Sequence, residues 1–200
     1  MKVSIKKILE PSTNWSDRFI PDYKELGDVV RRLKEMGYRV VLTLGVYDLV
    51  HEGHALYLEQ ARSHGDILIV GVDSDEFTKK RKGPNRPVVP QRERLKMLIH
   101  FRHVDIVTLR ESHHGMGNKN DLIEAVRPDV LVVSESTGDF PMKSIQSFKK
   151  VCGKIVTLPP QATTSTTARV RMLTIDGADQ FYNTLMEKIP ELYKEAFHTA

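Results

Sequence analysis

Two histidines with two residues between them are the most informative side chains of the chain. His51 and His54 flank Gly53 in the segment 43–54, which reads TLGVYDLVHEGH. Imidazole N–H groups aimed at a phosphate can stabilise the charge that develops on it, as the donors of an oxyanion hole do. Phosphoryl and nucleotidyl transfer depend mainly on positioning and charge stabilisation and need no covalent nucleophile. The pattern therefore favours chemistry on a phosphate group.

The segment lies between a predicted strand and a predicted helix. Residues 39–44 form a short aliphatic run, and residues 53–64 have apolar side chains at helical spacing. The start of a helix offers unpaired N–H groups and the positive end of its dipole, which suit an anion. Gly45 lets the backbone approach a ligand closely because it has no side chain. A pair of surface histidines is the simpler alternative, and the position between strand and helix favours a site.

Other phosphate and metal signatures are missing from the sequence. It contains no G-x-x-x-x-G-K-[ST] motif and no G-x-G-x-x-G motif after a strand, which argues against a P-loop or a dinucleotide site. The histidines lack the H-E-x-x-H frame of a zinc protease. Cys152 is the single cysteine, so an intramolecular disulfide and a cysteine-based zinc site are excluded. We expect no metal site built from protein side chains alone.

Short aliphatic runs alternate with segments of helical periodicity along the rest of the chain. Strands that alternate with helices imply βαβ crossovers and a parallel sheet with helices on both faces. The sequence predicts an α/β, Rossmann-like open sheet of five strands in the order 3-2-1-4-5. The predicted strands are 39–44, 67–72, 104–109, 130–133 and 155–158, and the predicted helices are 21–37, 53–64, 91–101, 121–126, 145–151, 168–173 and a tail over 177–198.

The composition is that of an ordinary globular protein with a mild positive charge. Of the 200 residues, 40% are hydrophobic and 28% are charged, and the formal net charge is +4. The apolar runs are too short to span a bilayer, and the N-terminus lacks the apolar stretch of a signal peptide, so no membrane partner is expected. The charge excess is too small to favour nucleic acid and suits anionic small molecules. Together with the single cysteine, these features predict a cytoplasmic protein.

Residues 45–54 match the pattern G-x-[YF]-D-[LM]-x-H-x-G-H at a first strand–helix turn. This motif resembles the signature of the nucleotidyltransferase superfamily that includes the cytidylyltransferases and the ADP-heptose synthases. Three further segments are similar to that family in the same order: 72–76 to its second strand end, 80–94 to its basic loop and next helix, and 164–167 to its S-T-[TS] motif. The basic loop looks closest to the ADP-heptose synthase branch. The similarity implies one nucleotidyltransferase domain over 1–200, with its core at about 39–173 and with 21–37 and 177–198 as appendages.

The resemblance implies a role for each matching position. His51 and His54 would stabilise the α-phosphate during the reaction, and Lys82 would be the third catalytic residue by neutralising phosphate charge. Lys80 and Arg81 would contact the substrate. The nucleotide would be bound by Gly45, Val46, Tyr47, Asp48, Gly53, Arg94, Ser165, Thr166 and Thr167.

Several of these positions also have a structural explanation. Asp48 could cap the helix that follows it, because Asp is a good N-cap residue. Arg94 could be a surface charge on an amphipathic helix. Residues 165–167 could be an N-cap cluster. The basic run 79–82 could be a solvated loop, although the histidines upstream favour a function for it.

The acceptor side departs from the family pattern. Where the family often has a Gly-Gly-Asp-like turn after the fourth strand, residues 134–139 read SESTGD. Ser134 and Glu135 are therefore candidate acceptor contacts. His113, in a glycine-rich stretch, is a further candidate, for which a solvated loop is the simpler interpretation.

The sequence thus predicts an enzyme that transfers a nucleoside monophosphate from ATP or CTP to a small phosphorylated acceptor and releases pyrophosphate. A sugar phosphate such as heptose 1-phosphate is the favoured acceptor, and a cytidylyltransferase acting on glycerol phosphate or an amino-alcohol phosphate is the alternative. A non-catalytic nucleotide-binding regulatory module and a nucleic-acid-binding protein that uses residues 79–82 are rivals from other classes. A class I aminoacyl-tRNA synthetase shares the H-x-G-H turn, but the chain is short for one and lacks a K-M-S-K-S-like loop.

Two partners are expected besides the substrates. Mg²⁺ should accompany the triphosphate, as is usual in this chemistry. A homodimer is expected because homodimers are the commonest soluble oligomers. The amphipathic stripe of the C-terminal helix, with Phe181, Leu185, Ile189, Leu192 and Phe197, could either close the core or pair with a second subunit.

Overall fold

A computed structural model of the chain describes residues 3–10, 14–111, 121–135, 148–161, 174, 177–178 and 180–189. The chain divides into two compact units, residues 1–161 and 162–200, and each is described by itself. In the second unit, residues 180–189 form a helix whose apolar side chains Phe181, Tyr182, Leu185, Met186 and Ile189 are exposed. The predictions of one domain and of a homodimer stay predictions.

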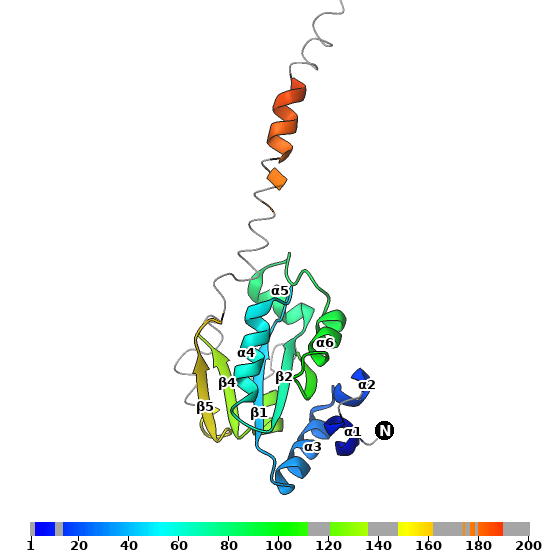
Figure 1. The fold of residues 1–200 in the computed structure, drawn as a ribbon, viewed down its shortest axis with the longest axis vertical. Helices are drawn as coiled ribbons and strands as arrows, with labels where there is room; N and C mark the ends of the chain where they lie inside the picture. The colour runs from blue at the N-terminus through cyan, green and yellow to red at the C-terminus, as the bar shows by residue number, and fades with distance from the viewer. Residues whose placement is uncertain are drawn as a thin grey trace, which may run out of the picture. The chain divides into compact units, whose positions relative to one another are not determined.

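The first unit is built on a five-stranded sheet in which every pairing is parallel (Figure 1). Its order is β3-β2-β1-β4-β5, which confirms the predicted order. The five strands are β1 (Val40–Gly45), β2 (Ile67–Asp73), β3 (Ile106–Arg110), β4 (Val130–Ser134) and β5 (Lys154–Leu158). Each lies within two residues of its predicted position. The register places Gly45 beside Val72 and Asp73 beside Arg110, so the ends of β1, β2 and β3 meet at one edge.

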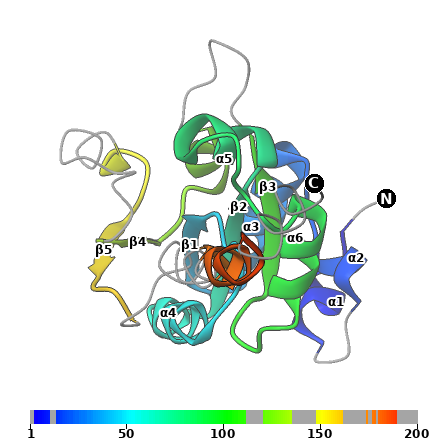
Figure 2. The same ribbon diagram turned by 90° about the horizontal axis from the view of Figure 1, so that it is seen from above.

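Helices cover both faces of this sheet, as predicted (Figure 2). On one face, α3 (Tyr23–Glu35) and α7 (Asp121–Val126) pack against alternate strand residues such as Leu42 and Ile69. On the other face, α4 (Glu52–Arg62) and α6 (Gln91–Ile99) pack against the residues between them, such as Val41 and Val70. Successive strand side chains point to opposite faces, and both faces are buried, which explains why the strands are continuously apolar.

The helix α5 (Asp75–Lys82) lies where the sequence predicts a basic loop. Its N-cap is Ser74, whose side chain accepts a hydrogen bond from the Phe77 N–H at 3.1 Å. It ends at Gly83, whose φ of 96° lies in the left-handed region that glycine adopts without strain. Four basic residues, 79–82, occupy its last turn and face the negative end of the helix dipole. The basic run is therefore helical and not a loop.

Residues 3–10 and 14–23 add structure before the first strand, and part of it lies along the outer edge of β3. Two short helices, α1 (Ile5–Leu9) and α2 (Trp15–Arg18), precede a single parallel bridge between Phe19 and Val107. The Ile20 N–H donates to the Val107 carbonyl at 3.0 Å, and the Tyr23 hydroxyl donates to the Leu109 carbonyl at 2.8 Å. Ile5, Ile8 and Ile20 are buried in the core. Both helices were absent from the sequence prediction.

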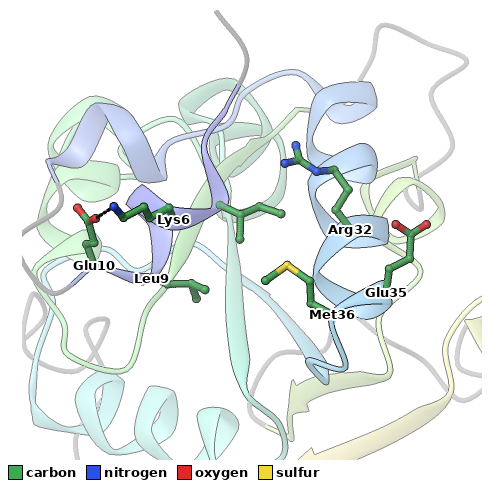
Figure 3. A pocket seen from close by; sticks show the side chains of 7 residues that line it. Lys6, Leu9, Glu10, Arg32, Glu35 and Met36 are labelled. Atoms are coloured by element: carbon green, nitrogen blue, oxygen red, sulfur yellow. Dashed lines mark ion pairs between the residues drawn. The ribbon is translucent and has the colours of Figure 1, made fainter.

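A hollow of about 660 Å³ lies between α1 and the last turns of α3 (Figure 3). Its lining includes Leu9 and Met36, which are exposed, and a Lys6–Glu10 ion pair of 3.9 Å. Because α3 leads into the first residue of β1, this hollow lies at the opposite end of β1 from the histidines. Among the described helices, none has the length and apolar character needed to cross a membrane.

Candidate active site

The turn that leaves β1 is held in an unusual backbone conformation. Tyr47 and Leu49 have φ angles of 53° and 44°, a region that costs a residue with a side chain about 1 kcal/mol or more. Gly45 makes the turn possible, because a Cβ atom there would lie 3.0 Å from Cε2 of the Tyr47 ring. Tyr47 is buried, and its hydroxyl has no hydrogen-bond partner in the part of the chain that the structure describes. Strain of this kind is characteristic of functional sites.

His51 and His54 cap the first turn of α4 with their own side chains. The Gly53 N–H donates to Nδ1 of His51 at 3.1 Å, and the His51 N–H donates to Nδ1 of His54 at 3.3 Å. This is a capping box in which imidazoles replace the usual hydroxyl and carboxylate. Because each Nδ1 accepts a hydrogen bond, each neutral ring carries its hydrogen on Nε2. The arrangement makes two Nε2–H donors at the carboxyl end of β1.

The surroundings of His54 keep its ring neutral. Burial, and then the electrostatic effects of His51 and Lys82, lower the pKa of His54 to about 4, against the weaker opposing effect of Asp48. The two imidazole rings lie 4.1 Å apart between centroids. A neutral imidazole with its hydrogen on Nε2 can still donate one hydrogen bond to a phosphate oxygen.

Asp48 joins this turn to the segment that follows α5. Its carboxylate is buried and accepts the N–H groups of Val88 and Val89, each at 2.9 Å. It also forms an ion pair of 3.3 Å with Arg86. The N-cap of α4 is His51, so the alternative that Asp48 caps this helix is wrong. Asp48 thus ties the turn to residues 88–89, and its contact with the nucleotide stays a prediction.

Arg94 lies beneath the same turn and is 1% exposed. Its guanidinium donates to the Val46 carbonyl, to the Val89 carbonyl at 2.8 Å and to the Asp75 carboxylate at 2.6 Å. It is therefore not a surface charge on an amphipathic helix. The structure places Arg94 beside the nucleotide turn, and its contact with phosphate stays a prediction.

The three basic candidates of α5 have different surroundings. Lys82 keeps contact with solvent, yet partial burial and the charges of Arg81 and Arg86 lower its pKa. Lys82 also acts electrostatically on His54 and lowers its pKa. Lys80 is exposed and forms an ion pair of 2.7 Å with Glu76.

Arg81 belongs to a buried ion-pair cluster at the ends of β2 and β3. It lies 2.5 Å from one carboxylate oxygen of Asp73, and Arg110 lies 3.2 Å from the other. Both guanidinium groups also lie about 5 Å from the centre of the Phe77 ring. Asp73 is fully buried, so the two arginines compensate a carboxylate that would be costly to bury alone.

Of the remaining candidate residues, two lie within the part of the chain that the structure describes and four lie outside it. Ser134 is the last residue of β4, and Glu135 follows it on the surface, where its N–H donates to the Leu158 carbonyl at 3.0 Å. His113, Ser165, Thr166 and Thr167 lie outside the described residues. Their roles stay predictions.

The sequence prediction did not identify the residues whose hydrogen bonds and ion pairs join the segments around the site to one another. These are Asp73, Asp75, Arg86, Gln91 and Arg110. A signal was present for Asp73 and Asp75, because acidic residues directly follow a buried strand at the edge where ligands bind. Nothing local identified Arg86 and Arg110 as the partners of buried carboxylates that lie far away in sequence.

The described residues contain no group of three or more His, Cys, Asp or Glu side chains that could hold a metal ion. The two buried carboxylates nearest the histidines, Asp48 and Asp73, are each engaged by an arginine.

Comparison with known proteins gives consistent matches. The cytidylyltransferase-like family model matches residues 42–176. The chain is 35% identical over 144 residues to the bifunctional protein HldE of Desulfatibacillum aliphaticivorans, and 38% identical over 130 residues to that of Nitratiruptor sp.. These matches cover 72% and 65% of this chain but only 29% and 27% of the relatives, so the chain spans less than a third of their length.

Solved structures agree with the family match. The lipopolysaccharide core biosynthesis protein from Thermoplasma volcanium has 29% sequence identity and a TM-score of 0.52, over 61% of this chain and 97% of that one. Pantoate-beta-alanine ligase from Francisella tularensis has a TM-score of 0.53 at 14% identity, over 70% of this chain and 66% of that one, and shows the fold alone. With the family model matching over more than half of its length and its histidine turn at the end of β1, the chain belongs to the cytidylyltransferase-like family of nucleotidyltransferases.

Proposed function

We propose that this protein transfers the adenylyl group of ATP to a sugar 1-phosphate of the heptose class and releases pyrophosphate. The observation that carries the proposal is the pair of imidazoles at the start of α4, each with Nδ1 engaged by a backbone N–H. Their Nε2–H groups are fixed donors at the place where an α/β sheet binds phosphates.

The reaction needs one bond to form and one to break. An oxygen of the acceptor phosphate attacks the α-phosphorus of the triphosphate, and the bond from that phosphorus to the bridging oxygen of the β-phosphate breaks. Negative charge grows on the α-phosphate oxygens and on the departing pyrophosphate. His51 and His54 would donate hydrogen bonds to the former, and Lys82 would neutralise charge on the phosphates.

Charge at this edge of the sheet favours a polyanionic ligand. Within the described residues, four cationic side chains pair with, or are influenced by, the buried carboxylates of Asp48 and Asp73. These cationic residues are Arg81, Lys82, Arg86 and Arg110. Cationic side chains at a site raise the affinity and the association rate of an anionic substrate.

The choice of acceptor and base rests on similarity. The basic segment resembles that of the ADP-heptose synthases, and a matching solved structure is a lipopolysaccharide core biosynthesis protein. Both support a sugar phosphate as acceptor and ATP as donor. We further propose that Mg²⁺ enters with the triphosphate, since phosphate oxygens and water are ligands that it prefers. When bound it would neutralise phosphate charge.

The test is pyrophosphate release with ATP and CTP, each offered with heptose 1-phosphate, glycerol 3-phosphate and ethanolamine phosphate. Release with ATP and heptose 1-phosphate alone is the expected result. Release that requires CTP and an alcohol phosphate would replace the proposal with the cytidylyltransferase alternative. Nucleotide binding without release for any pair would refute these activities and favour a regulatory module.

A further inference from the structure

Arg94 is surrounded by acceptors of the protein itself. Its three side-chain nitrogens each donate to a different segment: the turn after β1 at Val46, the segment before α6 at Val89, and the start of α5 at Asp75. With 1% of its surface exposed, the guanidinium has almost no face left for a ligand. A planar fork with several fixed donors suits this triple contact, which a lysine could not reproduce.

The contact with Asp75 extends to a second helix through Gln91. The Gln91 N–H donates to the Asp75 carboxylate at 2.9 Å, and the Asp75 N–H donates to the Gln91 side-chain carbonyl at 2.8 Å. Each side chain thus satisfies the first N–H group of the other residue's helix, α5 or α6. Because Arg94 shares the same carboxylate oxygen as Gln91, the starts of α5 and α6 are fixed to one another.

This network connects the two parts of the site that would contact the phosphates. One part is the turn that leads into His51 and His54, and the other is α5, which ends at Lys82. Arg94 contacts the turn and the start of α5 directly, while Asp48 ties the same turn to Val88 and Val89. The distance between Lys82 and His54 therefore depends on buried contacts that touch neither residue.

We propose that Arg94 is a positioning residue, which together with Asp75 and Gln91 fixes α5 and its Lys82 against the histidine turn, and is not a ligand of the triphosphate. The proposal rests on the proposed function for its kinetic consequences. Displacement of a catalytic group by about 1 Å can slow a reaction about 10²-fold even when the altered residue lies away from the chemistry.

The kinetic test compares Arg94→Met, Arg94→Lys and Asp75→Asn with the double variant Arg94→Met/Asp75→Asn. We expect kcat to fall roughly 10²-fold in Arg94→Met and in the same direction in Asp75→Asn. The double variant should be no slower than Arg94→Met, because both changes break one network. Arg94→Lys should not restore activity, and Arg92→Met, which removes an exposed charge from the same helix, is the matched control.

The phosphate-ligand alternative gives a different pattern. If Arg94 bound the triphosphate, Asp75→Asn would release it from a competing carboxylate, so kcat would be unchanged and Mg-ATP would bind at least as tightly. Arg94→Lys would then keep a large part of the activity. Either result would overturn the positioning role.

A second measurement needs no substrate and therefore separates this inference from the proposed function. The imidazole resonances of His54 are followed by NMR against pH in the wild type, Arg94→Met and Gln91→Ala. The titratable groups that act on His54 are His51, Lys82 and Asp48, and burial is the largest effect. Loosening the turn should admit water and raise the pKa of His54 from about 4 toward 6.5. An unchanged pKa in both variants, with Arg92→Met as the control, would overturn the proposal even if no acceptor were found.

Discussion

The neutral state of His54 has a consequence for stability that can be measured without any substrate. In the folded protein its pKa is about 4, below the ordinary value of 6.5, mainly because the ring is largely buried. Between these two pH values the unfolded chain takes up a proton that the folded protein does not. Above pH 6.5 His54 is neutral in both states, so its titration does not change the free energy of unfolding. As the pH is lowered from about 6.5 to about 4, this titration lowers the free energy of unfolding.

The magnitude follows from the two pKa values. At roughly 1.4 kcal/mol for each pH unit, the interval corresponds to about 3 kcal/mol, as an upper limit because His54 keeps some contact with solvent. The perturbation is His54→Asn, since the amide oxygen of Asn can accept the His51 N–H as Nδ1 does and the side chain does not titrate.

The assay is denaturant unfolding of the wild type and the variant at pH 7 and pH 4.5. The wild type should lose up to about 2.4 kcal/mol more than His54→Asn over this interval. Effects of all other titrating groups are common to both proteins and cancel in the comparison. His100→Asn, which removes an exposed histidine, is the control. Equal losses in the wild type and His54→Asn would refute the buried, neutral state of His54.

Three further predictions concern turnover and packing. His54→Ala should lower turnover roughly 10²–10³-fold, the loss expected for one preorganised donor, and near-wild-type pyrophosphate release from a folded variant would contradict its role. Lys82→Gln should lower kcat/KM for the triphosphate by roughly 10²-fold while Lys79→Gln, which changes an exposed residue of the same helix, does not, and steady-state kinetics of both variants decide the matter. Tyr47→Phe should stabilise the fold by about 1 kcal/mol, because it removes a buried hydroxyl that has no partner among the described residues, and a lowered melting temperature would show that the hydroxyl is satisfied after all.

The strands were predictable because each is a short aliphatic run that is buried on both faces. Helix α7 was predicted with its observed bounds, since Pro128 gives its end. Helix α5 was missed because only Phe77 and Thr78 of its eight residues are buried, which leaves no apolar periodicity to detect. The short helices α1 and α2 are held by packing against the core and by contacts with β3, which the sequence does not reveal locally.

The histidine motif gave the position of the site but not its internal structure. A capping box is recognised by Ser or Thr and by Glu or Gln, so two histidines in these positions gave no such signal. The family pattern placed Arg94 near the nucleotide, and it could not distinguish a phosphate ligand from a buried guanidinium that holds the turn from below. That distinction depends on acceptors as distant in sequence as Val46.

Phe19, which bridges to Val107 in β3, lies before the region that the family model matches. The family match begins at residue 42, yet β3 would be an open edge strand without residues 14–20. An unprotected edge presents N–H and C=O groups to any other strand and invites association between chains. The segment before the family region therefore covers part of the β3 edge. Trp15, the single tryptophan, stacks on Phe19 at 4.8 Å between ring centroids and offers a fluorescent reporter of whether this segment is in place.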